Sequence, residues 1–109
     1  MTAALVAELV AGIGAPSAAV RQDSAQAVTD VHRGLADGDV SRLAVALVSA
    51  RLVEKDSGCQ ESQLDALSDL KAWHHIREEL LRPLRQLREA GSPGPQDEYL
   101  DDLLVPESS

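Results

Sequence analysis

Apolar residues recur every three or four positions along most of this chain, which is the spacing of residues on one side of an α-helix. In the first half, this spacing predicts helices over about residues 2–13, 17–35 and 39–56. Each helix is expected to bury one apolar stripe against its neighbours. The stripes contain Leu5, Leu9 and Ile13, then Val20, Ala27, Val28, Val31 and Leu35, and then Leu43, Ala46, Leu47, Ala50 and Val53.

Polar residues that commonly begin and end helices flank these three stretches. Thr2, Ser17 and Asp39 are the expected N-caps, because their side-chain oxygens can accept the first free backbone N–H groups. Ser57 and Gly58 are expected to end the third helix near residue 56 by breaking the helix and capping its C-terminus.

The second half predicts a fourth helix over about residues 60–73 and a fifth over 77–90. Pro83 lies inside the fifth, where it removes one backbone hydrogen bond, so the chain should kink there or begin a new helix. Residues 91–95 read as a flexible break before a short acidic helix, and residues 106–109 as a frayed end. The apolar residues are Leu64, Leu67, Leu70 and Trp73, then Leu80, Leu81, Leu84 and Leu87, and then Tyr99, Leu100, Leu103 and Leu104.

The pattern as a whole predicts one all-α domain over residues 1–109. With no Phe, one Tyr and one Trp, the core must be built from aliphatic side chains. AVTDV at 27–31 and ALSDL at 66–70 match class for class, 39 residues apart, close to the period of HEAT-type helical repeats. We therefore favour a short right-handed α-solenoid of about five to six helices in HEAT-like pairs, with a compact up-down helix bundle as the alternative.

Charge narrows the range of partners. The chain carries 18 acidic and 10 Lys or Arg residues, a net charge of −8 at pH 7. Nucleic acid and anionic membranes both need a basic surface, so neither is an expected partner. The apolar N-terminus lacks the basic region of a signal peptide and is too short to span a bilayer, and a single Cys forms no internal disulfide. A cytoplasmic protein is expected.

The segment EKDSGCQESQLDALSDLKAWHH contains residue types that bind metals or catalyse reactions, but their spacing disfavours both. Cys59 and His74 are separated by about 22 Å along one helix, and His32 is remote in sequence. His74 and His75 are expected at a helix C-terminus, where the dipole favours a cation. Cys59 is expected to be a buried or capping residue, since its nearest basic side chains are Lys55 and the histidines at the far end of the helix, and a nucleophile also needs an oxyanion-stabilising pocket. We therefore expect no metal, no cofactor and no enzymatic activity.

Recognition of another protein is the remaining function. Acidic residues at a spacing of four indicate an exposed acidic helix face, and Tyr99 in its acidic surround has the composition of an interface anchor. Tyr99 could equally hold the last helix to the core, and Trp73 is expected in the core because it continues a leucine stripe. The residues expected to contact a partner are Asp65, Asp69, Glu98, Tyr99, Asp101 and Asp102.

The stretch LVEKDSGCQESQLDALSDLKAWHHI, followed by a Leu/Arg helix and EYLDDLL, resembles small HEAT-repeat-type immunity proteins that GC-rich bacteria encode beside polymorphic toxins. The resemblance covers about residues 40–105. It implies a protein that binds one cognate toxin and blocks its active site or substrate groove, and it assigns no binding residues. Because toxins that attack nucleic acid have basic clefts, an acidic inhibitor suits such a partner.

A helical adaptor without inhibitory activity is the alternative function. Such a module could self-associate, for example by burying the Leu-rich edge of its fifth helix. The sequence does not decide between a monomer and an oligomer.

Overall fold

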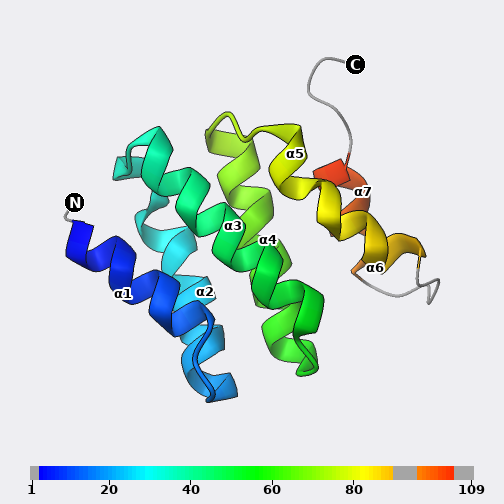
Figure 1. The fold of residues 1–109 in the computed structure, drawn as a ribbon, viewed down its shortest axis with the longest axis horizontal. Helices are drawn as coiled ribbons and strands as arrows, with labels where there is room; N and C mark the ends of the chain where they lie inside the picture. Colours follow the sequence, from blue (N-terminus) through cyan, green and yellow to red (C-terminus); the bar gives the residue numbers. More distant parts are fainter. Residues whose placement is uncertain (1–2, 90–95, 105–109) are drawn as a thin grey trace.

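The computed structural model describes residues 3–89 and 96–104, and every secondary-structure element in these ranges is helical (Figure 1). The prediction of an all-α chain is confirmed. Two 3₁₀ turns, η1 (His32–Gly34) and η2 (Arg82–Leu84), extend or interrupt the α-helices. The α-helices are α1 (Ala3–Ile13), α2 (Ala18–Val31), α3 (Asp37–Val53), α4 (Ser57–Trp73), α5 (Glu78–Leu81), α6 (Arg85–Glu89) and α7 (Asp97–Leu104).

The helices lie in two layers, one in front of the other in Figure 1. The front layer holds α1, α3 and the bent stretch α5–η2–α6, and the back layer holds α2, α4 and α7. Neighbouring helices within each layer pack together, and each front helix also packs on the back helix of its own pair. The molecule is 18 Å thick and extends 38 by 35 Å in the other directions. It is a short row of three helical pairs, as expected for a small α-solenoid.

The two matching sequence segments occupy equivalent places in this row. Residues 27–31 lie at the end of α2 and residues 66–70 lie on α4, and these two helices adjoin in the back layer. Val28 and Leu67, which match in the two segments, are both fully buried. The spacing of 39 residues therefore fits the step from one helical pair to the next.

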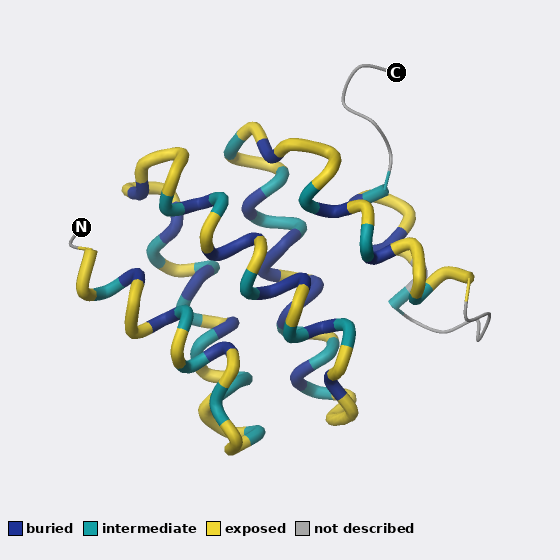
Figure 2. Tube along the Cα trace, viewed as in Figure 1, coloured by how far each residue is buried: buried dark blue, intermediate teal, exposed yellow. Residues whose placement is uncertain are grey.

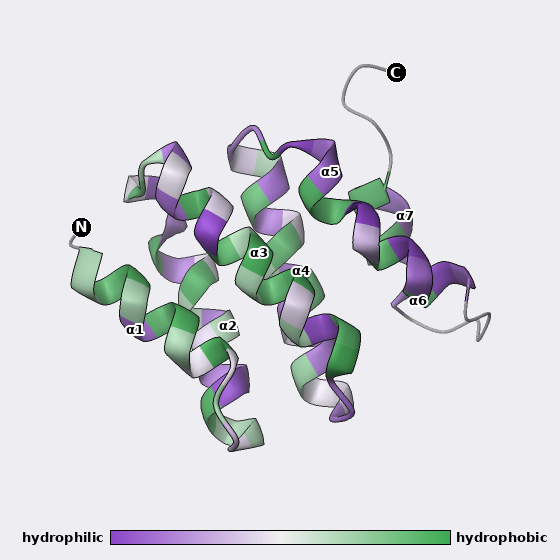
Figure 3. Cartoon of the chain, in the orientation of Figure 1, coloured by the Kyte–Doolittle hydropathy of each residue, from purple (hydrophilic) through white to green (hydrophobic). Residues whose placement is uncertain are grey.

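The core lies between the layers and is aliphatic, as the composition requires (Figures 2 and 3). Leucine and valine fill most of it, with Ile13 at the end of α1 and Ile76 before α5. The last helix contributes Leu100 and Leu103, so α7 belongs to the same core. The other buried leucines and valines are Val6, Leu9, Val28, Leu35, Val40, Leu43, Leu47, Val48, Leu64, Leu67, Leu70, Leu81 and Leu84.

The junction between α3 and α4 differs from the prediction. Ser57 and Gly58 do not end the third helix, because α3 already ends at Val53 and Ser57 begins α4. Asp56 is the N-cap of α4, and its carboxylate accepts the backbone N–H of Cys59 at 2.9 Å. The break between the two helices is therefore marked by the residue that caps the start of α4, and not by a glycine at the end of α3.

The first turn of α3 also differs. Asp39 was expected as its N-cap, but the helix begins two residues earlier, at Asp37, and Ala36 occupies the cap position without a side-chain hydrogen bond. Asp37 and Asp39 both lie in the first turn, where negative charge is favoured by the helix dipole. By contrast, Ser17 caps α2 as predicted, accepting the N–H of Val20 at 3.4 Å.

Three apolar residues expected in the core are exposed. Val20, Val53 and Trp73 keep 45%, 76% and 57% of their surface accessible. In α3 the buried side is set by contacts with α1, α4 and α5 at once, so it is centred on Leu43, Leu47 and their neighbours rather than on Val53. Trp73 is the last residue of α4 and extends beyond the leucine stripe that precedes it.

Pro83 interrupts the fifth predicted helix. The chain forms one α-turn before it, a 3₁₀ turn that contains it, and a second α-turn after it. The second predicted helix is likewise shorter, since α2 ends at Val31 and η1 follows. The predicted cap Thr2, the break at 91–95 and the frayed end at 106–109 lie outside the described residues. No helix in the described ranges combines the length and apolar character needed to cross a membrane.

Candidate functional site

Three acidic residues of α4 lie along one line on the back layer. Glu61, Asp65 and Asp69 are spaced by four, so they occupy successive turns of the same helix side. This side lies between α2 and α7, because Glu61 and Asp65 share a pocket with residues of both helices. We call these three residues the α4 ridge. Asp65 and Asp69 were expected to contact a partner, and the structure places both on one side of α4 together with Glu61.

A pocket of about 350 Å³ adjoins the N-terminal half of the ridge. It joins three helices of the back layer and brings Tyr99 of α7 beside Asp65, 34 residues earlier in the chain. From the sequence, Asp65 and Tyr99 were both expected to contact a partner, but not to lie next to each other. The side-chain amides of Gln22 and Gln26 on α2, which also line the pocket, were not predicted. We call this the α4 pocket, and its lining is Gln22, Gln26, Gly58, Glu61, Ser62, Asp65 and Tyr99.

The α4 pocket is electrostatically negative. Partial burial raises the pKa of Asp65, and the charges of Asp69 and Glu61 raise it further. Burial also raises the pKa of Tyr99, with the carboxylates of Asp65, Glu61 and Glu98 adding to the effect. These carboxylates repel one another, so a cation entering the pocket would relieve the repulsion. The arrangement suits a lysine or arginine side chain.

Tyr99 is held in place because α7 is fastened to α4. Lys71 of α4 donates to the backbone carbonyls of Asp102 at 2.6 Å and Leu103 at 3.3 Å, in the last turn of α7. At the other end of α7, the Gln96 side chain donates to that of Gln60 at 2.9 Å. A half-buried aromatic ring on a fastened helix loses little freedom on binding, which favours a role as an anchor.

The remaining predicted residues are spread along α7. Glu98 is exposed and close enough for its charge to act on Tyr99. Asp101 turns toward α6, where its carboxylate lies 3.0 Å from Nη2 of Arg88. Asp102 is exposed, and only its backbone carbonyl has a described contact. Asp101 and Asp102 therefore do not line the α4 pocket.

A histidine pair, His32 buried and His74 half-buried, lies near the other end of the ridge. Nδ1 of His32 and Nε2 of His74 are 3.2 Å apart, and His74 Nε2 is also 3.0 Å from the backbone carbonyl of His32. One arrangement satisfies both contacts: His74 Nε2–H donates, and His32 Nδ1 carries no proton. His32 Nε2 then faces Asp69 at 3.9 Å. His74 was expected to be a helix-end cation, and its partnership with His32 was not foreseen because 42 residues separate them.

An exposed pair lies next to these histidines. The guanidinium carbon of Arg33 is 3.8 Å from the centre of a Trp73 ring, a cation–π contact. Trp73, expected in the core, therefore lies on the surface one helical turn beyond Asp69. The α4 ridge thus runs from Tyr99 at one end toward Trp73 at the other.

Glu54 and Cys59 form part of a structural network rather than a reactive one. Arg21 holds Glu54 with two hydrogen bonds, of 2.8 Å to Oε1 and 2.9 Å to Oε2, and lowers the pKa of Glu54 to about 2. Cys59 is buried, as predicted, and its thiol donates to the carbonyl of Ala18 at 3.1 Å. Burial raises the pKa of the Cys59 thiol, which disfavours the reactive thiolate at neutral pH.

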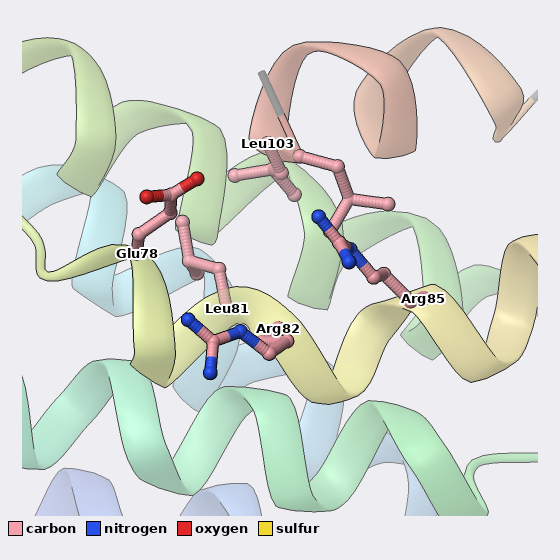
Figure 4. A pocket seen from close by; sticks show the side chains of 6 residues that line it. Glu78, Leu81, Arg82, Arg85 and Leu103 are labelled. Carbon is pink, nitrogen blue, oxygen red and sulfur yellow. The ribbon is translucent and has the colours of Figure 1, made fainter. Parts of the chain in front are cut away.

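A smaller pocket of about 220 Å³ lies between the α5–α6 stretch and α7 (Figure 4). Leu81 and Leu103 form its apolar wall, while Glu78, Arg82 and Arg85 lie around its rim. Its rim carries charges of both signs, unlike the α4 pocket. We interpret it as the incompletely filled contact between the two helices of the third pair.

Within residues 3–89 and 96–104, no three His, Cys, Asp or Glu side chains are placed to hold a metal ion. Comparisons with protein-family models, with curated proteins and with solved structures each find no match to this chain. The α4 pocket is thus the candidate site whose geometry combines charge, an aromatic ring and a hollow.

Proposed function

We propose that this protein binds another protein through the α4 ridge and the α4 pocket, and that it acts as an immunity protein that neutralises a cognate toxin with a basic cleft. The observation that carries the proposal is the meeting of Glu61, Asp65 and Tyr99 around one pocket. A lysine or arginine of the partner would meet two carboxylates and an aromatic ring there, and each of these attracts a cation.

The openness of the site favours binding over catalysis. Glu61 and Asp65 are exposed to solvent rather than enclosed in a water-excluding cavity. A general acid or base needs a positioned substrate and a tuned pKa, whereas steering of a partner needs only accessible charge. The net charge of −8 adds a long-range attraction toward a basic protein.

The two aromatic residues extend this surface. Tyr99 and the Trp73–Arg33 pair lie at opposite ends of the α4 ridge. Tyr, Trp and Arg are the residue types that carry most binding energy in protein interfaces. Asp101 contributes less at short range than expected from the sequence, because Arg88 already neutralises it.

A non-enzymatic helical adaptor is the second candidate function, and it uses the same surface. It differs from the immunity protein in its partner, which would be a component of an assembly rather than a toxin. The gene next to that of this protein distinguishes the two: a secreted protein with a C-terminal toxin domain supports the immunity function, and a metabolic operon supports the adaptor.

The test is the affinity of the purified chain for the C-terminal domain of the protein encoded immediately upstream, measured by titration calorimetry. We expect tight binding, weakened at least tenfold by Asp65→Lys and by Tyr99→Ala. Glu89→Lys, at an exposed carboxylate of α6, makes the same change in net charge and should have a much smaller effect. Absence of binding contradicts the toxin partner, and equal effects of the two lysine substitutions contradict the assigned surface.

A further inference from the structure

The front layer exposes a stripe of alternating polar and apolar residues on α3, which lies in the other layer from the α4 ridge. The exposed residues of α3 beyond its first turn are Arg42, Val45, Ser49 and Val53, whose spacing of three or four places them on one helix side. Val45 and Val53 belong to the four large apolar residues that the described part of the chain leaves exposed. The neighbouring helix α1 adds exposed alanines, Ala4, Ala7 and Ala11.

A groove of about 380 Å³ lies beside this stripe, at the contact of α1, α3 and the start of α5. Its apolar residues are Val10, Val45, Ala46 and Leu80, and it is large enough to receive valine or leucine side chains from another helix. Its polar residues are Ser41, Arg42 and Arg77. We call it the front groove.

We propose that the front groove and the α3 stripe form a homodimer interface, in which the exposed Val45 at the edge of the groove of each copy inserts into the front groove of the other. A ridge beside a groove is self-complementary, which a two-fold interface requires because both copies present the same surface. The broad side of the molecule extends 38 by 35 Å, which leaves room for the roughly 800 Å² per partner of a standard interface.

The distribution of charge favours this side over the other for self-association. Arg42 and Arg77 flank the front groove in exposed ion pairs with Asp39 at 3.9 Å and Glu79 at 3.4 Å. Glu8 is exposed on the adjoining α1, so in a dimer these arginines can also meet the Glu8 carboxylate of the second copy. The α4 ridge lies in the other layer of a molecule 18 Å thick, beyond the screening length of about 8 Å at physiological ionic strength. A front-to-front dimer therefore keeps the acidic ridges apart and leaves both exposed.

The test is sedimentation velocity of the full chain from about 1 µM to about 1 mM, a range that covers the dissociation constants of modest interfaces. We expect the wild type to shift from monomer to dimer with concentration. Val45→Glu should remain monomeric throughout. Val20→Glu is the matched control, because Val20 on α2 is as exposed as Val45, at 45% and 46%, and should dimerise like the wild type.

Circular dichroism of each variant verifies that it is folded, and both substitutions are at exposed sites where folding should survive. A wild type that stays monomeric across the whole range overturns the proposal. A dimer that Val20→Glu abolishes and Val45→Glu leaves intact overturns it as well, because the interface would then include the back layer. The result is independent of the toxin, since it uses no other protein.

Discussion

At the scale of single residues, the fold depends on a few buried polar groups that join separate helices. Glu54 follows α3, yet it binds Arg21 of α2 and Gln63 of α4. Its Oε2 also accepts the backbone N–H groups of Lys55 and Asp56 at 3.2 Å each. One carboxylate therefore fixes the turn between α3 and α4 against the first helical pair.

Replacing Glu54 with Gln should destabilise the protein by about 2 kcal/mol at pH 7, because the partly exposed Arg21 loses the carboxylate charge that it faces. The pKa of Glu54 is lowered from 4.5 to about 2, so its contribution is complete above pH 4.5 and is lost as the pH falls toward 2. Urea unfolding at pH 7 and near pH 2 measures the difference. A gap between wild type and Glu54→Gln that does not narrow in acid would argue against this role.

His32 should make the fold sensitive to mild acid. Burial lowers its pKa from the ordinary 6.5, and His74 and Arg33 lower it further, while Asp69 opposes them. In the folded state, His32 therefore becomes protonated at a lower pH than in the unfolded state. The contribution of neutral His32 to folding stability is complete above about pH 6.5 and declines below that pH. His32→Asn should remove this part of the decline between pH 7 and 5, whereas His75→Asn, at an exposed position, should retain it.

At the scale of elements, the period of apolar residues was sufficient to locate the helices but not all of their ends. The α7 helix and the interruption at Pro83 were predicted from local chemistry alone. The start of α3 was not, because three residues near it, Asp37, Gly38 and Asp39, all have turn or cap chemistry and only packing selects among them. Trp73 was placed in the core for a different reason: the apolar spacing of α4 continues to Trp73, but the buried contacts of the helix end before it.

The caps give a direct comparison between sequence and structure. Asp56→Ala should destabilise the protein by about 1 kcal/mol, because the N–H of Cys59 loses its acceptor. Asp39→Ala removes only a first-turn charge with an ion pair to Arg42 at 3.9 Å, so its effect should be smaller than about 0.5 kcal/mol. Denaturant unfolding of both variants measures this. The opposite order of effects would restore Asp39 as the functional cap.

At the scale of the whole molecule, the two layers carry different surfaces. The back layer exposes the α4 ridge with its pocket, and the front layer exposes the α3 stripe with its groove. The sequence predicted that Asp65 and Asp69 share one side of α4, because a spacing of four residues within one helix can be read from the sequence alone. It did not predict the pocket, because Gln22, Asp65 and Tyr99 meet only when α2, α4 and α7 pack together. In the α5–η2–α6 stretch, Leu81 and Leu84 are buried, whereas Leu80 is half-buried and lines the front groove.

The most direct measurement of the central claim is an NMR map of binding. The isotope-labelled chain is titrated with the toxin domain encoded upstream, and amide shift changes are followed residue by residue. The account predicts that the largest changes occur at Glu61, Asp65 and Tyr99, with smaller ones toward Asp69 and Trp73, and that they weaken as salt rises. Changes centred instead on Val45 and the front groove would contradict the claim that the α4 ridge binds the partner.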